Sequence, residues 1–164
     1  MNPTVSVLAA LALSASVAQV HAQTTETKKT LTLEGAKAVA AAAAAEAKRG
    51  NEGGSIAIVD DGGNLVYLER IQPTFAMGTT ISTEKARTAA LFGKPTKILE
   101  DAIVAGRTPL LNAWSAPLNG GEPIKVDGQI VGAIGVSGAS SAARDAAIAI
   151  AGAGALGSQS SATK

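Results

Sequence analysis

SIAIVDDGGNLVYLER, residues 55–70, is the stretch that decides the fold of this chain. Residues 55–60 and 64–70 are rich in β-branched and aliphatic side chains, which predicts two strands. Asp61-Gly62-Gly63 lies between them, and its glycines can adopt the positive φ angles of a tight turn. We therefore expect a β-hairpin, and with it an antiparallel sheet rather than a doubly wound parallel one.

Working outward, a second hairpin is expected at 122–126 and 129–136, around the turn signal Asp127-Gly128. Helices are expected from Thr32 to 49, from Ser82 to 92, from 95 or 96 to about 105, and from 142 to about 151 after Ser140 or Ser141. A short strand or extended segment is expected near 110–114. The order predicts one α+β domain, an antiparallel sheet of about five strands flanked by helices.

The first 22 residues have the layout of a cleavable secretory signal. Residues 5–20 are apolar or small almost throughout, and Val20-His21-Ala22 places small residues at −3 and −1 of a cut before Gln23. We expect a signal peptide at 1–22, a flexible lead-in at 23–30, the domain at 31–157 and a disordered tail at 158–164. The protein is then periplasmic or secreted, with no membrane insertion after cleavage.

Composition excludes several classes of function. The chain has 14 basic and 13 acidic residues scattered along it, so no electrostatic footprint for nucleic acid exists. It has no cysteine, and its one histidine, His21, leaves with the predicted signal. Aromatic residues make up 2% of the chain, and a core of small aliphatic side chains favours extra burial between subunits. We expect a homo-oligomer without disulfides.

Two serine motifs carry little catalytic meaning. The junction at 135–139, Gly-Val-Ser-Gly-Ala, resembles a nucleophile elbow, but the predicted mature chain has no imidazole to take the proton from Ser137. Ser82 and Lys85 match Ser-x-x-Lys, but the companion motifs of penicillin-recognising enzymes are absent. A capping serine followed by a solvated lysine explains that motif better. Asp60-Asp61 is ordinary turn chemistry rather than a metal site.

Three stretches together resemble the GlcG/HbpS family, which also includes the C-terminal domain of propanediol-utilisation corrinoid adenosyltransferases. They are 55–70, quoted above, then EKARTAA at 84–90, then NGGEPIKVDGQIVGAIGVSG at 119–138 with Asp145 beyond. The likeness runs from about residue 31 to residue 155. Its most specific part is the Gly-Gly-x-Pro hairpin followed by VGAIGVSG.

The resemblance implies an α/β domain that assembles into dimers or higher oligomers such as octamers. It also implies haem binding in one exported branch that acts with a sensor protein, and a place beside glycolate or diol metabolism in other members. The positions that match the family pattern are Arg70, Lys85, Gly120, Gly121, Gly135, Ser137, Gly138 and Asp145. All of these except Gly135 and Gly138 are taken as candidate small-molecule ligand-binding residues.

We therefore expect an exported, non-catalytic protein that binds haem or another tetrapyrrole. The alternative is an accessory protein or enzyme acting on a small hydroxyacid or diol-type metabolite. Without histidine or cysteine, the iron ligand must be the phenolate of Tyr67, the thioether of Met77, or a weak oxygen donor such as Thr79, Thr80 or Ser82. Arg70 or Lys85 is expected to pair with the haem propionates.

Overall fold

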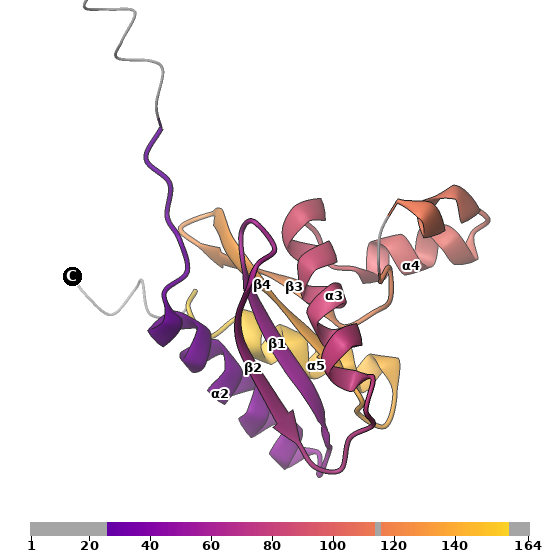
Figure 1. Ribbon diagram of the computed structural model, residues 1–164, viewed down its shortest axis with the longest axis horizontal. Helices are drawn as coiled ribbons and strands as arrows, with labels where there is room; N and C mark the ends of the chain where they lie inside the picture. The colour runs from indigo at the N-terminus through magenta and orange to yellow at the C-terminus, as the bar shows by residue number, and fades with distance from the viewer. Residues whose placement is uncertain (1–25, 114–115, 158–164) are drawn as a thin grey trace, which may run out of the picture.

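The computed structural model describes residues 26–113 and 116–157 (Figure 1). The predicted signal peptide and the predicted tail at 158–164 lie outside the described residues. Within the described ranges, no helix has the length and apolar character needed to cross a membrane.

Two hairpins form one antiparallel sheet with the strand order β2-β1-β4-β3. The strands are β1 (Gly54–Asp60), β2 (Leu65–Ile71), β3 (Gly121–Val126) and β4 (Gln129–Ser137). The hairpins join through β1 and β4, where Ser55 pairs with Ser137 and Ile58 with Ile134. The predicted α+β fold is confirmed, with four strands in the described residues.

Helices cover both faces of this sheet (Figure 1). Helices α2 (Leu33–Arg49) and α5 (Ala142–Ala153) pack on one face, and α3 (Gly78–Phe92) packs on the other. The main core lies under α2 and α5, where Ile56, Ile58, Ile134 and Ile148 are fully buried. Under α3 the side chains are smaller, mostly alanine, so this helix lies very close to β4.

Two of the predicted helix starts are confirmed by their capping bonds. The Thr32 hydroxyl accepts a hydrogen bond from the Gly35 N–H, 3.1 Å, and the Ser141 hydroxyl accepts one from the Arg144 N–H, 3.2 Å. The predicted start at Ser82 is wrong. Helix α3 begins four residues earlier, at Gly78, and Ser82 is fully buried within it. The first turn has a weak helix propensity, which its burial against the sheet outweighs.

Beyond α3, the chain forms helix α4 (Lys97–Val104) and a 3-10 helix, η1 (Thr108–Asn112). The 3-10 helix takes the place of the strand or extended segment expected near 110–114, and Pro109 in its first turn suits this tight helix. Helix α4 and η1 pack together and project from the side of the domain (Figure 1).

The described part of the lead-in, residues 26–30, contains no helix or strand. It runs along the two hairpin turns. Lys28 forms an ion pair with Asp61 in the first turn, and Lys29 forms one with Asp127 in the second. Residues from three distant parts of the chain therefore meet at this end of the sheet.

Candidate functional site

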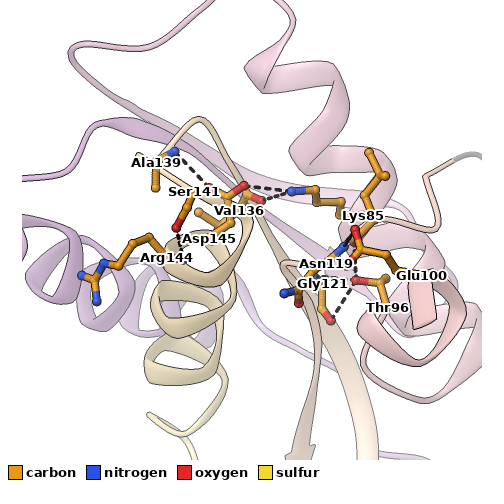
Figure 2. A network of polar contacts seen from close by, with 11 residues as sticks. Lys85, Thr96, Glu100, Asn119, Gly121, Val136, Ala139, Ser141, Arg144 and Asp145 are labelled. Carbon is orange, nitrogen blue, oxygen red and sulfur yellow. Dashed lines mark hydrogen bonds and ion pairs between the residues drawn. The ribbon is translucent and has the colours of Figure 1, made fainter. Parts of the chain in front are cut away.

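Lys85 and Asp145 form a buried ion pair where α3, β4 and α5 meet. The Lys85 Nζ donates to the Val136 carbonyl oxygen, 2.9 Å, and to Asp145 Oδ2, 3.0 Å (Figure 2). The two side chains are only 4% and 8% exposed. The expectation of a solvated lysine is therefore wrong: the residue two turns into α3 points inward because Asp145 and Val136 offset the cost of removing its charge from water.

Asp145 occupies the first turn of α5, where the helix dipole favours a carboxylate. Its second oxygen, Oδ1, accepts a hydrogen bond from the Ala139 N–H, 3.0 Å. Burial raises the pKa of Asp145 above its ordinary value, whereas the Lys85 ammonium and the N–H groups of Ala139 and Gly138 act to lower it. The carboxyl group thus ties the end of β4 to both helices.

Gly120 and Gly121 have a packing role beside this pair. Gly120 has a φ of 112°, and a Cβ at this position would lie 2.8 Å from the Val136 oxygen and 3.1 Å from Lys85 Nζ. A Cβ on Gly121 would lie 2.5 Å from the Lys85 carbonyl oxygen. Glycine at both positions therefore lets the start of β3 close over Lys85.

Thr96 is a buried polar residue that the sequence did not predict. It holds the segment 118–121 in place. Its hydroxyl donates to the Leu118 carbonyl, 2.6 Å, and accepts from the Gly121 N–H, 2.9 Å (Figure 2). The N–H of Asn119 donates to Glu100 of α4, 3.3 Å. A threonine before a helix is typical of a cap, so the sequence carried no signal for its bonds to residues 118–121.

A second region lies on the side of α3 that faces the edge strand β2. We call it the β2–α3 groove; it has a volume of about 290 Å³ and is lined by Leu68, Thr79, Thr80, Thr83 and Glu84. Met77 directly precedes α3 and is 55% exposed. Arg70 is exposed two residues beyond Leu68 on the same face of β2. Open space and hydroxyl groups are thus combined at this groove, and the Met77 thioether lies two residues before Thr79 in the chain.

The structure does not bring the two predicted iron ligands together. Tyr67 pairs with Ile58 across the hairpin and packs against the core under α2, on the opposite face of the sheet from α3. Its hydroxyl lies 3.5 Å from Glu69 Oε2. Met77 lies at the start of α3. Met77 is two residues before Thr79, which lines the β2–α3 groove, whereas Tyr67 lies on the other face of the sheet.

Of the six candidate ligand-binding residues, the structure gathers five around the end of β4. Lys85 and Asp145 contact each other, Gly120 and Gly121 enclose Lys85, and Ser137 is buried at the end of the strand. Arg70 is the exception, on the exposed edge strand. All five are buried or packed closely, so Arg70 is the one of the six whose side chain is exposed to a ligand from solvent.

Residues 31–154 match the family model described as haem degrading protein HbpS-like. This range covers nearly all of the described domain. The chain belongs to the HbpS-like family. The predicted resemblance to the GlcG/HbpS family is confirmed.

Relatives of this HbpS-like chain share both sequence and fold. It is 45% identical over 113 residues to protein GlcG of Escherichia coli K12, covering 68% of this chain and 84% of that protein. The crystal structure of a double mutant of HbpS from Streptomyces reticuli has a TM-score of 0.71 and 31% identity, covering 82% of this chain and 92% of that one. Protein ORFY of Klebsiella pneumoniae has a TM-score of 0.74 and 27% identity, covering 82% of this chain and 95% of that one.

In the described residues of this HbpS-like chain, no group of three or more His, Cys, Asp or Glu side chains is placed to bind a metal ion. Asp60, in the first hairpin turn, accepts a hydrogen bond from the Asn64 N–H, 2.8 Å. That bond lowers the pKa of Asp60. Asp61 pairs with Lys28. Both aspartates therefore serve the turn and its contact with the lead-in.

Proposed function

We propose that this protein is an exported, non-catalytic haem-binding protein and that it holds haem at the β2–α3 groove. The observation that carries the proposal is the open groove itself, which is lined by Leu68 and by the threonines at 79, 80 and 83, with the exposed Met77 directly before α3. The family description, haem degrading protein HbpS-like, supports haem as the ligand.

The residues at the groove fit haem as a surface-bound group. A volume of about 290 Å³ is at the lower end of pockets that enclose a small molecule, so the macrocycle would lie on Leu68 rather than inside a cavity. Met77 and the hydroxyls of Thr79 and Thr80 are weak donors to iron, in place of histidine or cysteine. Tyr67, on the opposite face of the sheet, does not fit this position.

Each groove residue has a separate part in this proposal. Leu68 would give an apolar contact surface, Met77 or a threonine hydroxyl would hold the iron, and Arg70 would pair with a propionate. Bound haem supplies an iron centre that takes axial ligands and changes oxidation state. Because the protein donors are weak and the site is open, we expect ferric haem to be held loosely.

The absence of catalysis is proposed from the state of the charged residues. Lys85 and Asp145 are closed off from solvent and bonded to each other, so neither is available to move a proton on a ligand in the groove. Ser82, the other member of the Ser-x-x-Lys motif, is fully buried and donates its hydroxyl to the Thr79 carbonyl, 3.0 Å.

We further propose that the protein forms homo-oligomers outside the cytoplasm. Export is proposed from the signal-like sequence at 1–22. Oligomerisation is proposed from large apolar side chains that remain exposed on the described surface: Leu65, Leu68, Leu91, Ile98, Val104 and Leu111. Intact mass of the exported protein, beginning at Gln23, and light scattering at micromolar concentration test these two points.

An absorption titration with haemin tests the proposed binding. We expect a saturable change in the haem band of the wild-type protein, weakened by Met77→Ala. Tyr67→Phe is the matched control, since it removes the phenol from the other face of the sheet, and we expect it to bind as the wild type does. No saturable change for the wild type would overturn the proposal, and equal binding by Met77→Ala would remove Met77 as a donor.

A second candidate function is supported by the named relatives. Protein GlcG and an uncharacterised protein from the dhaT-dhaS intergenic region of Citrobacter freundii, 34% identical over 114 residues, are both similar to this chain. This supports the alternative of an accessory protein or enzyme for a small hydroxyacid or diol-type metabolite. Turnover of such a compound by the purified protein would favour this candidate over haem binding.

A further inference from the structure

A pocket larger than the β2–α3 groove lies at the end of the sheet where the two hairpin turns meet. Its volume is about 520 Å³, and residues 29–32, the β3–β4 hairpin and the end of α5 form its walls; we call it the lead-in pocket. Val131 lines it near the start of β4, whereas Lys85 contacts Val136 near the other end of that strand. Pockets of about 300–1,000 Å³ hold small molecules, so this one has room for a ligand of its own.

The walls of the lead-in pocket are mainly aliphatic. Leu31 and Val131 are buried members of the main core, and Val126 and Leu156 are partly buried and pack against the same core. An aliphatic chain in the pocket would therefore contact four aliphatic side chains and would lose its own contact with water, which favours binding.

The polar groups of the lead-in pocket carry no net charge. Among the described residues, its charged lining residues are Lys29 and Asp127, which form an ion pair with each other. Thr30 and Thr32 line the pocket as well and are exposed. The Thr32 hydroxyl accepts a hydrogen bond from the Gly35 N–H, so its own O–H can still donate. The pocket therefore suits a neutral polar group better than a carboxylate or an ammonium group.

Gly35 is an independent observation that points to an open pocket. It lines the pocket from the first turn of α2, a helix that otherwise consists largely of alanine. Alanine stabilises a helix more than glycine does, so glycine at this position lowers the stability of the helix. A Cβ on Gly35 would lie 3.1 Å from Leu31 Cδ1 and 3.6 Å from Leu156 Cδ1. Glycine thus leaves free the space between two walls of the pocket.

We propose that the lead-in pocket binds a small uncharged aliphatic molecule with one hydrogen-bonding head group, such as a medium-chain alcohol. The aliphatic walls contact the chain of the ligand, and the hydroxyls of Thr30 and Thr32 bond to its head group. This inference goes beyond the proposed function, because the pocket is separate from the β2–α3 groove and its ligand is not haem.

The remaining parts of the sequence match this pocket less well than a separate ligand does. Leu156 lines the pocket, and the sequence after Gly157 reads Ser-Gln-Ser-Ser-Ala-Thr-Lys, which is mostly polar. Polar side chains gain little from contact with aliphatic walls. The apolar residues at 5–20 belong to the predicted signal peptide, which export would remove.

The test is a titration of the ¹⁵N-labelled protein with 1-hexanol, with ethanol at equal concentration as the solvent control. We expect saturable shifts of the amide signals of Gly35, Val126 and Val131, and none at Thr79 and Thr80, which line the β2–α3 groove. Hexanoate and hexylammonium have the same length of chain with a charge, and both should bind more weakly than 1-hexanol. The inference is overturned by the absence of saturable shifts, by equal shifts at the two sites, or by tighter binding of either ion.

Two leucine variants locate the binding. Gly35→Leu places a side chain in the lead-in pocket and should abolish the shifts at Val126 and Val131. Gly154→Leu is the matched control, because Gly154 does not line the pocket and the nearest atom to a Cβ there is 3.5 Å away. Circular dichroism checks the fold of both. Should Gly35→Leu not fold, Gly35→Ala favours the helix and should still weaken binding. Wild-type affinity for 1-hexanol in the folded Gly35 variant would overturn the inference.

Asp127→Asn tests the charge balance of the pocket. Asp127 has a φ of 49°, which asparagine also tolerates, so the turn should be kept. The substitution removes the negative charge that pairs with Lys29. Hexanoate should then bind about two- to fivefold more tightly than to the wild type, the range for an exposed ion pair, with the affinity for 1-hexanol unchanged. An unchanged affinity for hexanoate would overturn the proposed class of ligand. None of these outcomes depends on whether the protein binds haem.

Discussion

The two sides of helix α3 differ in how their polar groups are buried and paired. Toward β3 and α5, Lys85 and Asp145 are buried, paired and enclosed by glycines. Toward β2, the groove is open to solvent and is lined by Leu68 and three threonines. Buried, paired polar groups fix the structure, whereas exposed ones are available to a ligand, so the family pattern alone does not distinguish a binding residue from a packing residue.

The largest effect that would sharpen this comparison is expected for Lys85→Met. The substitution leaves the Asp145 carboxyl buried without its ammonium partner, and we expect a loss of about 3–5 kcal/mol of unfolding free energy. Chemical denaturation measures it. Adding Asp145→Leu to Lys85→Met should restore part of the loss, since it removes the unpaired group.

Lys97→Met is the control for that experiment. Lys97 also pairs with an aspartate, Asp101, at 2.6 Å, but both side chains are more than half exposed, so its loss should have little effect on stability. Equal losses of unfolding free energy in Lys85→Met and Lys97→Met would contradict the comparison, because the burial of an ion pair would then not determine its contribution to stability.

A smaller effect is expected for Gly135→Ala, on the packed side of α3. A Cβ at this position of β4 would lie 2.0 Å from the Ser82 carbonyl oxygen in the helix backbone. The helix must move to admit it, so we expect about 1–3 kcal/mol of destabilisation by denaturation. Gly62→Ala, in the first hairpin turn, is the control, where the nearest atom is an Asn64 side-chain nitrogen at 3.1 Å; a similar loss there would argue against close helix packing as the cause.

Leu68→Glu tests the open side of α3. Leu68 is 38% exposed on the edge strand, so the change should alter the unfolding free energy by only about 0.5 kcal/mol or less. Haemin binding should fall nonetheless, because a carboxylate replaces the apolar surface of the groove. A Leu68→Glu protein that unfolds easily yet binds haemin normally would show that Leu68 stabilises the fold and does not bind haem.

The last test concerns the dependence of stability on pH. Burial raises the pKa of Glu122, on the edge strand β3, from 4.5 to about 7. The unfolded chain therefore releases this proton at lower pH than the folded protein, and stability should fall as the pH rises from about 4.5 to 7. The raised pKa of Asp145 acts in the same direction. Denaturation at pH 5 and pH 8 should show this fall, reduced in Glu122→Gln and unchanged in Glu34→Gln, which alters an exposed glutamate.

Local patterns predicted the elements of the fold well. Turns and helix caps depend on residues that are neighbours in the chain, so their signals can be read from the sequence. This holds for the turns at Asp61-Gly62-Gly63 and Asp127-Gly128 and for the caps at Thr32 and Ser141. The start of α3 was not predicted, because its first turn, Gly-Thr-Thr, is helical only when it is packed on the sheet.

The arrangement of the candidate site could be seen only in the structure and not in the sequence. Lys85 and Asp145 were both singled out by the family resemblance, but their pairing depends on two helices meeting at the end of β4, which no local pattern encodes. The buried face of α2 was hidden in a run of alanines.

The sheet order has a consequence for how the chain is made. The two central strands, β1 and β4, lie at opposite ends of the domain in sequence, so the hairpin at 54–71 has no partner sheet until residue 137 has been synthesised. Pairings between such distant segments form slowly, because the intervening chain must first be ordered. The central strand pair of the sheet therefore forms only after β4 has been made.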